Sequence, residues 1–242
     1  MGAGAGAMPT PELLPKVCAV PITRTQQPLN LGVEFGTVSG MRLYYRVGTG
    51  RPMRVAWTLE EIGAPYECVS VSAEEAKQPE HLARHPLGRV PVLEQDDQIV
   101  FESAGVCLHL ADQYPDAGLI APVGSHDRAL TYQWTIFAMT EVEVPIIEFL
   151  RNRESDPERA AAGLERFNAA ATALEQALEG HEFLLGSSLT VADIVMRGVL
   201  GLAEYAQIDT AAYPNLTSYM DRLKARPAFQ RALASTESVL RS

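Results

Sequence analysis

A glutamate and a serine stand side by side at Glu102-Ser103, at the start of a segment that is predicted to be a helix, SAGVCLHLADQY (103–114). At the N-terminus of that helix, the Ser103 hydroxyl, the free N–H groups of the first turn and the positive end of the helix dipole all favour a bound carboxylate. Ser103 can also serve as a plain N-cap, and that role is compatible with binding. Ser103 is therefore a candidate to receive a carboxylate, whereas Glu102 taken alone is equally consistent with a solvated surface charge.

A proline precedes this pair, in the segment GRVPVLEQDDQIVFES (88–103). Two β-rich runs, 90–93 and 99–101, flank the polar turn Asp96-Asp97 and predict a β-hairpin. Pro91 lies inside the first run, although a central strand does not tolerate proline because its nitrogen cannot donate to the ladder. Pro91 therefore indicates either an edge strand or a bend that serves a ligand.

The elements that must position these residues alternate between strand and helix from Met41 to about residue 115. Their order is predicted as strand, helix, strand, polar helix or loop, hairpin and helix, with boundaries at 41–47, 51–63, 66–71, 74–84, 90–101 and 103–114. One parallel unit with a crossover helix, followed by an antiparallel hairpin, gives a compact mixed sheet.

The rest of the chain is predicted to be helical. The expected helices lie at 128–152, 157–180, 190–206, 216–224 and 227–240. Pro145 should kink the first of them, and the third is almost wholly apolar and hence central to a bundle. Thr190 and Asp193 are expected to cap this third helix, with Leu189 and Ile194 as a hydrophobic staple, a role in folding alone. The predicted fold class is thus α/β plus all-α.

Four parts are expected along the chain. Residues 1–40 are rich in Gly, Ala and Pro and lack the pattern of a secretory signal, so they are predicted to be a flexible N-terminal extension. The mixed-sheet domain should occupy 41–115, a linker rich in Pro, Gly and Asp 116–126, and the helical domain 127–242.

The composition argues against two classes of partner. Hydrophobic residues make up 47% and charged residues 21% of the 242 residues, as in a globular domain. The formal net charge of −10 argues against nucleic acid, which requires clustered Lys and Arg. No apolar run approaches the roughly 20 residues of a transmembrane helix, so no membrane partner is expected.

The three cysteines, Cys18, Cys68 and Cys107, have neither the even number of a disulfide framework nor the spacing of a zinc site. Cys68 and Cys107 are interpreted as small buried apolar residues. No metal is expected, and a reducing, cytoplasmic location fits best.

Four segments resemble the cytosolic glutathione S-transferases, of bacterial type and without a clear class. They are LYYRVGTGRPMRVAWTLEEIGAPYE (43–67), HPLGRVPVLE (85–94), FESAGVCLHLADQYP (101–115) and LTVADI (189–194). Their joint order and spacing carry the resemblance, which extends from Met41 to the C-terminus. It implies a thioredoxin-like N-terminal domain followed by a helical bundle domain, and a homodimer.

The resemblance also implies a glutathione site in the opening segment. In this family the proline of such a motif is cis, so the backbone of Val90 beside Pro91 would face the cysteinyl part of glutathione. Glu102 and Ser103 match the pair that holds the γ-glutamyl group, and Arg89 the position near the glycyl carboxylate. His85 stands where the family commonly has Asn, and this departure leaves it without a role.

Activation of the glutathione thiol is assigned to the start of the first helix. The thiolate, not the thiol, is the nucleophile, and a free thiol has a pKa of about 8.5. By position in the family motif, Thr49 would supply the activating hydroxyl. The backbone N–H groups of Gly50 and Arg51 could do the same, and the Arg51 charge is a further way to favour the thiolate. No cysteine lies beside Thr49, which disfavours the glutaredoxin-like and beta-class variants.

The second substrate is expected to be a small apolar electrophile. Its pocket could be walled by a stripe of large side chains on the first bundle helix, although such a stripe is more often simple core; the residues are Tyr132, Trp134, Phe137 and Met139. The predicted function is thus a detoxifying transferase with glutathione as co-substrate. A non-catalytic glutathione-binding or scaffold protein and a glutathione-dependent disulfide or peroxide reductase are the alternatives.

Overall fold

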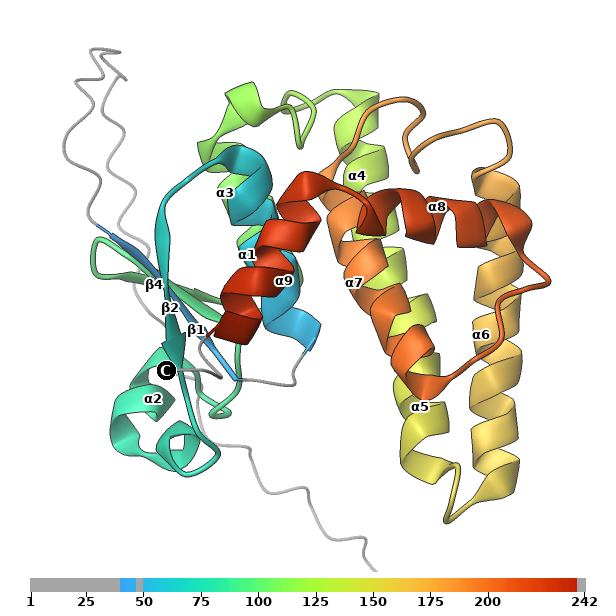
Figure 1. Cartoon of the computed structure of the whole chain (residues 1–242), viewed down its shortest axis with the longest axis horizontal. Helices are drawn as coiled ribbons and strands as arrows, with labels where there is room; N and C mark the ends of the chain where they lie inside the picture. Colours follow the sequence, from blue (N-terminus) through green and yellow to red (C-terminus); the bar gives the residue numbers. More distant parts are fainter. Residues whose placement is uncertain (1–39, 47–49, 239–242) are drawn as a thin grey trace, which may run out of the picture. The chain divides into compact units, whose positions relative to one another are not determined.

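The computed structural model describes residues 40–46 and 50–238 (Figure 1). Residues 1–39 of the predicted flexible extension, which include Cys18, and Thr49 lie outside these described residues. Within them, no helix combines the length and the apolar character that a bilayer span requires.

A four-stranded mixed sheet forms the first half of the described chain. Its strands are β1 (Met41–Tyr45), β2 (Tyr66–Ser70), β3 (Val92–Gln95) and β4 (Gln98–Phe101), in the order β2-β1-β3-β4. β1 and β2 are parallel, whereas β3 is antiparallel to both β1 and β4. Asp96 and Asp97 have positive φ angles of 49° and 63°, as a two-residue hairpin turn requires. The predicted mixed sheet and hairpin are confirmed.

The two faces of the sheet are buried by different helices. Successive strand residues point to opposite faces, so Leu43 joins the main core whereas Tyr44 joins a small cluster with Ala76. The helices of this half are α1 (Gly50–Ile62), α2 (Pro79–Arg84) and α3 (Ser103–Gln113), with short 3₁₀ turns at Glu75–Lys77 and Pro115–Ala117. α1 packs against α3.

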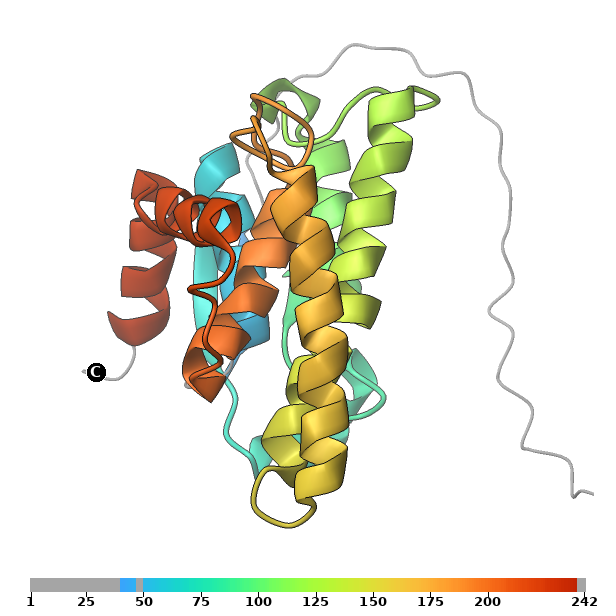
Figure 2. The same ribbon diagram turned by 90° about the vertical axis from the view of Figure 1, so that its right-hand side faces the viewer.

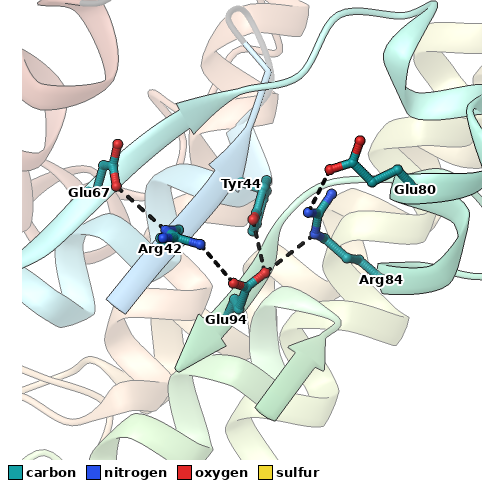
Figure 3. A network of polar contacts seen from close by, with 6 residues as sticks. All are labelled: Arg42, Tyr44, Glu67, Glu80, Arg84 and Glu94. Atoms are coloured by element: carbon teal, nitrogen blue, oxygen red, sulfur yellow. Dashed lines mark hydrogen bonds and ion pairs between the residues drawn. The ribbon is translucent and has the colours of Figure 1, made fainter. Parts of the chain in front are cut away.

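A polar network on the outer face of the sheet connects β1, β3 and α2 (Figure 3). Glu94 on β3 accepts hydrogen bonds from Arg42 at 3.0 Å, from the Tyr44 hydroxyl at 2.9 Å and from Arg84 at 3.4 Å. Arg84 also pairs with Glu80 one helical turn earlier. The network holds the end of α2 against the sheet and so positions the chain that enters the Val90-Pro91 segment.

The second half of the described chain is helical. It contains α4 (His126–Phe137), α5 (Val144–Asn152), α6 (Pro157–Ala177), α7 (Val191–Ala206), α8 (Pro214–Lys224) and α9 (Pro227–Ser238). The apolar helix α7 packs against both α1 and α4, and α5 packs against α6 (Figures 1 and 2). The central position of α7 agrees with the sequence prediction.

A π-helical segment, η3 (Ala138–Glu143), joins α4 to α5 where the sequence predicts one kinked helix. Pro145 lies at the start of α5 and has no N–H for the Glu141 carbonyl one turn earlier. The wider π turn ends at Glu143, two residues before the proline. Such segments occur often at functional sites.

The predicted cap of α7 is present and fully buried at Asp193. One carboxylate oxygen accepts the N–H and the hydroxyl of Thr190, both at 2.8 Å. The other accepts the Leu184 N–H at 2.9 Å and the Tyr219 hydroxyl at 3.0 Å. The cap thus also fixes the preceding loop and α8 onto α7.

Candidate functional site

One hollow brings together seven residues from three separate parts of the chain. Its lining consists of Arg51, His85, Arg89, Val90, Pro91, Glu102 and Ser103. All but His85 belong to the set that the sequence singles out. Gly50 is exposed at the start of α1 and is not among the lining residues, and Thr49 lies outside the described residues.

The Val90–Pro91 peptide bond is cis, as the resemblance implies. Pairing of β3 with β1 begins at Val92, opposite Tyr44, so Val90 lies outside the ladder of the sheet. Val90 is half-buried and Arg89 is exposed, and both line the hollow. The backbone of Val90 is therefore available beside the hollow instead of being used by a neighbouring strand.

Glu102 and Ser103 differ sharply in their surroundings. Glu102 is exposed and has φ 69° and ψ 107°, a conformation that is uncommon for a residue other than glycine and that occurs often at functional sites. Its carbonyl accepts the Val106 N–H at 2.9 Å and begins α3. Ser103 is buried, and its hydroxyl oxygen accepts a hydrogen bond from Arg54 Nη1 at 3.2 Å.

A buried ion-pair network lies behind Ser103. Arg54 Nη2 on α1 contacts Glu143 Oε1 on the π segment at 2.6 Å, with both side chains at most 4% exposed. Arg51 donates to the same carboxylate, from Nη2 to Oε2 at 2.8 Å and from Nε to Oε1 at 3.3 Å. Burial raises the pKa of the Glu143 carboxyl, but the charges and hydrogen bonds of Arg54 and Arg51 outweigh it and hold that pKa below its usual value.

His85 is the lining residue to which the sequence analysis gives no role. It is buried, and its ring lies beside that of Phe101 with the centroids 4.7 Å apart. Its Nδ1 accepts the Leu87 N–H at 3.2 Å, so the neutral ring carries its proton on Nε2. Burial lowers the His85 pKa, which keeps the ring neutral at pH 7. The one signal in the sequence that pointed to His85 was its place in the HPLG motif, where the family commonly has Asn.

Both cysteines of the described residues are unsuited to nucleophilic chemistry. Cys107 is fully buried and Cys68 is half-buried, and each is a free thiol. Burial raises the pKa of each to about 11. Because the thiolate is the reactive form, these thiols are inert near neutral pH. The prediction of buried apolar roles is confirmed for Cys107 and holds in part for Cys68.

The proposed electrophile residues lie on α4 and the π segment, and none of them lines the hollow. Trp134, Phe137 and Met139 are half-buried against the main core, with the Trp134 and Phe137 rings edge to face at 5.4 Å. Tyr132 is exposed, and its hydroxyl accepts from Arg128 Nε at 2.6 Å. Met139 is linked to the hollow through Arg54: its sulfur lies 3.2 Å from Arg54 Nη1, which also donates to the lining residue Ser103.

Sequence reasoning missed Arg54 and Glu143 altogether. The two residues are 89 positions apart in the chain, so no motif or spacing relates them. Arg54 is a charged residue between the apolar residues Met53 and Val55, and that was the available signal. Among the described residues, no group of three or more His, Cys, Asp or Glu side chains could hold a metal ion.

Two sequence models match the chain. The glutathione S-transferase N-terminal domain matches residues 39–112, and the glutathione S-transferase C-terminal domain matches residues 128–227. Among individual proteins, the chain is 28% identical over 201 residues to glutathione S-transferase GstA of Escherichia coli O157:H7, covering 81% of this chain and 98% of the relative.

Solved structures show the same similarity. A glutathione transferase of Methylococcus capsulatus strain Bath is 32% identical with a TM-score of 0.75, and the match covers 82% of this chain and 99% of the other. A sphingomonad glutathione S-transferase, crystallised in complex with glutathione, is 31% identical with a TM-score of 0.72. That match covers 81% of this chain and 98% of the other.

Proposed function

Because the chain belongs to the glutathione S-transferase family, we propose that the hollow binds glutathione and that the protein transfers the glutathione thiolate to a small apolar electrophile. The observation that carries this proposal is the hollow itself. Residues from α1, from the segment before β3 and from the start of α3 meet there, and six of the seven are those that the family motif singles out.

Each charged part of glutathione has a counterpart in the site. Ser103 and the first turn of α3 receive the γ-glutamyl carboxylate, and the exposed Glu102 carboxylate receives the adjacent ammonium. The backbone of Val90 pairs with the cysteinyl residue as an added strand would, beside Pro91. Arg89 receives the glycyl carboxylate.

The charge balance of the site favours this ligand. Three arginines, Arg51, Arg54 and Arg89, face or adjoin two glutamates, Glu102 and Glu143. The site therefore carries one excess positive charge while His85 is neutral. Glutathione carries two carboxylates and one ammonium at pH 7, hence one net negative charge. Complementary charge of this kind raises the rate of association and selects against cationic ligands.

The second substrate is proposed to bind beside Met139, with Trp134 and Phe137 forming the apolar wall and Tyr132 at its exposed end. A homodimer, a cytoplasmic location and a detoxifying role are proposed with it. We also retain the proposed division into a glutathione-binding domain at 41–115, a linker at 116–126 and a helical domain at 127–242.

The activity is tested with the full-length protein on immobilised glutathione and with a chloronitrobenzene electrophile. We expect retention on the resin and glutathione-dependent turnover. Loss of both would overturn the proposal. A non-catalytic binder would be retained but would leave the pKa of the bound thiol near its free value of about 8.5. A disulfide or peroxide reductase would oxidise glutathione when a disulfide or a peroxide is supplied as the electron acceptor in place of the chloronitrobenzene.

Replacing Thr49 with valine tests how the thiol is activated. If the hydroxyl donates to the sulfur, its loss should raise the pKa of the bound thiol by about 1 to 2, since a hydrogen bond to a charged group contributes about 1.5–3 kcal/mol. Thiolate absorbance against pH measures this directly. Thr172→Val, at an exposed threonine on α6, is the matched control. A pKa that is unchanged in T49V and lies below the free value of about 8.5 would assign activation to the N–H groups of Gly50 and Arg51 or to the Arg51 charge.

A further inference from the structure

We propose that Arg54 is a positioning residue that fixes the Ser103 hydroxyl as a donor toward the ligand carboxylate, and that Glu143 holds Arg54 in that geometry. This inference rests on the proposed function, because it concerns the γ-glutamyl end of the same site. It assigns roles to two buried residues, one on α1 and one on the π segment.

The direction of one hydrogen bond carries the argument. A guanidinium has five donors and no acceptor, so in the Arg54–Ser103 contact at 3.2 Å the serine oxygen must accept. A hydroxyl has a single proton. With a lone pair occupied by Arg54, the Ser103 proton is left for another partner, and Ser103 lines the hollow. Arg54 thereby prepares Ser103 to donate to an acidic group there.

Glu143 fixes the guanidinium that does this. Arg54 Nη2 contacts Glu143 at 2.6 Å, which leaves Nη1 directed at Ser103. Arg51 binds the other side of the carboxylate and prevents it from turning away. The fork of an arginine has a rigid geometry, so a contact on one nitrogen determines where the next one points. The helical half of the chain thus reaches the γ-glutamyl subsite through Glu143.

The stem of Arg54 is confined as closely as its head. A Cβ atom placed on Gly198 of α7 would lie 2.5 Å from Arg54 Cγ and 2.7 Å from its Nε. Glycine at 198 therefore leaves the space through which Arg54 passes. The two Nη groups of Arg54 bind Ser103 and Glu143. The buried Nε has no hydrogen-bond partner among the described residues.

A double-mutant cycle between Arg54→Lys and Ser103→Ala tests the inference, with glutathione affinity measured by calorimetry. Ser103→Ala should weaken binding by about tenfold to a hundredfold, because a hydrogen bond to a charged group is lost. Arg54→Lys keeps the charge but loses the fork, and it should weaken binding by about tenfold. The double variant should bind no worse than Ser103→Ala alone.

A second ligand separates positioning from a general effect on the fold. In 4-aminobutyryl-Cys-Gly the γ-glutamyl residue keeps its ammonium and lacks its α-carboxylate. Arg54→Lys should leave the affinity for this analogue unchanged, whereas a merely structural role would lower both affinities alike. Arg197→Lys is the matched control, since Arg197 is equally buried and is paired with Glu204 at 2.9 Å; its glutathione affinity should equal that of the unmodified protein.

Gly198→Ala provides the same test without altering any charge, should Arg54→Lys not fold. The new methyl group should displace Arg54 and reduce discrimination between glutathione and the analogue by about tenfold. Additive effects in the cycle, or equal losses for both ligands, would overturn the role of Arg54 while leaving the proposed function intact. An unmodified protein that binds no glutathione would instead overturn the proposed function, and this inference with it.

Discussion

Replacing Glu143 with alanine is expected to lower the free energy of unfolding by about 3–5 kcal/mol, the usual loss when one partner of a buried ion pair is removed. The substitution leaves the guanidinium of Arg54 buried without a counter-charge, and it frees Arg51 as well. Urea denaturation at pH 7 measures the change. Glu80→Ala is the control, because Glu80 is 81% exposed and its pair with Arg84 should contribute less than about 1 kcal/mol.

The ionisation of Glu143 should make the stability of the fold depend on pH in a specific way. Although burial opposes ionisation, Arg54 and Arg51 hold the pKa of Glu143 below its ordinary value of 4.5. A group whose pKa is depressed on folding stabilises the protein above its unfolded pKa, and this contribution is lost as the pH falls through the folded value. Glu143→Gln should therefore lose less stability than the unmodified protein as the pH falls below about 4.5. Parallel curves for the two proteins would contradict the assignment.

Asp193→Ala is expected to have a comparable effect on stability, of about 3–5 kcal/mol, and to act through a different part of the molecule. Four donors would lose their acceptor: two backbone N–H groups and two hydroxyls. The N–H of Leu184 and the hydroxyl of Tyr219 would then be left unpaired in the interior, where desolvated polar groups are costly.

Thermal and urea unfolding of Asp193→Ala measure this loss. Asp221→Ala, at an exposed aspartate on α8, is the matched control and should change the free energy of unfolding by less than about 0.5 kcal/mol. Since Asp193 lies outside the hollow, any fraction that remains folded should bind glutathione normally. A folded variant with lost affinity would show that the cap acts on the site as well.

The segment from residue 88 to residue 103 could be predicted because its parts are local. The turn at Asp96-Asp97, the proline at the entrance to β3 and the serine at the start of α3 each express a preference of a few neighbouring residues. The structure has the hairpin and the helix where the sequence predicts them, and the cis bond where the family resemblance implies it. The α7 cap is likewise a local feature that the sequence predicts, because Thr190 and Asp193 are three residues apart.

Long-range packing was beyond the reach of these rules. Helix α9, predicted only as a final amphipathic helix, packs on α1, where Trp57 and Phe229 meet edge to face at 5.1 Å and Arg226 binds Glu61. The π segment was also unforeseen, since the absence of one N–H at Pro145 predicts a disturbance without saying which form it takes.

The sequence by itself therefore determined the hairpin, its turn and the start of α3, because these are set by adjacent side chains, and the family motif indicated which of their residues line the hollow. Only the tertiary structure decided which buried side chains pack behind these residues. Arg54 and Glu143 lie 89 positions apart, and the burial that makes their pairing obligatory exists only once α1, α7 and the π segment have packed together. A charge in water has no need of a partner, whereas a charge in the interior does.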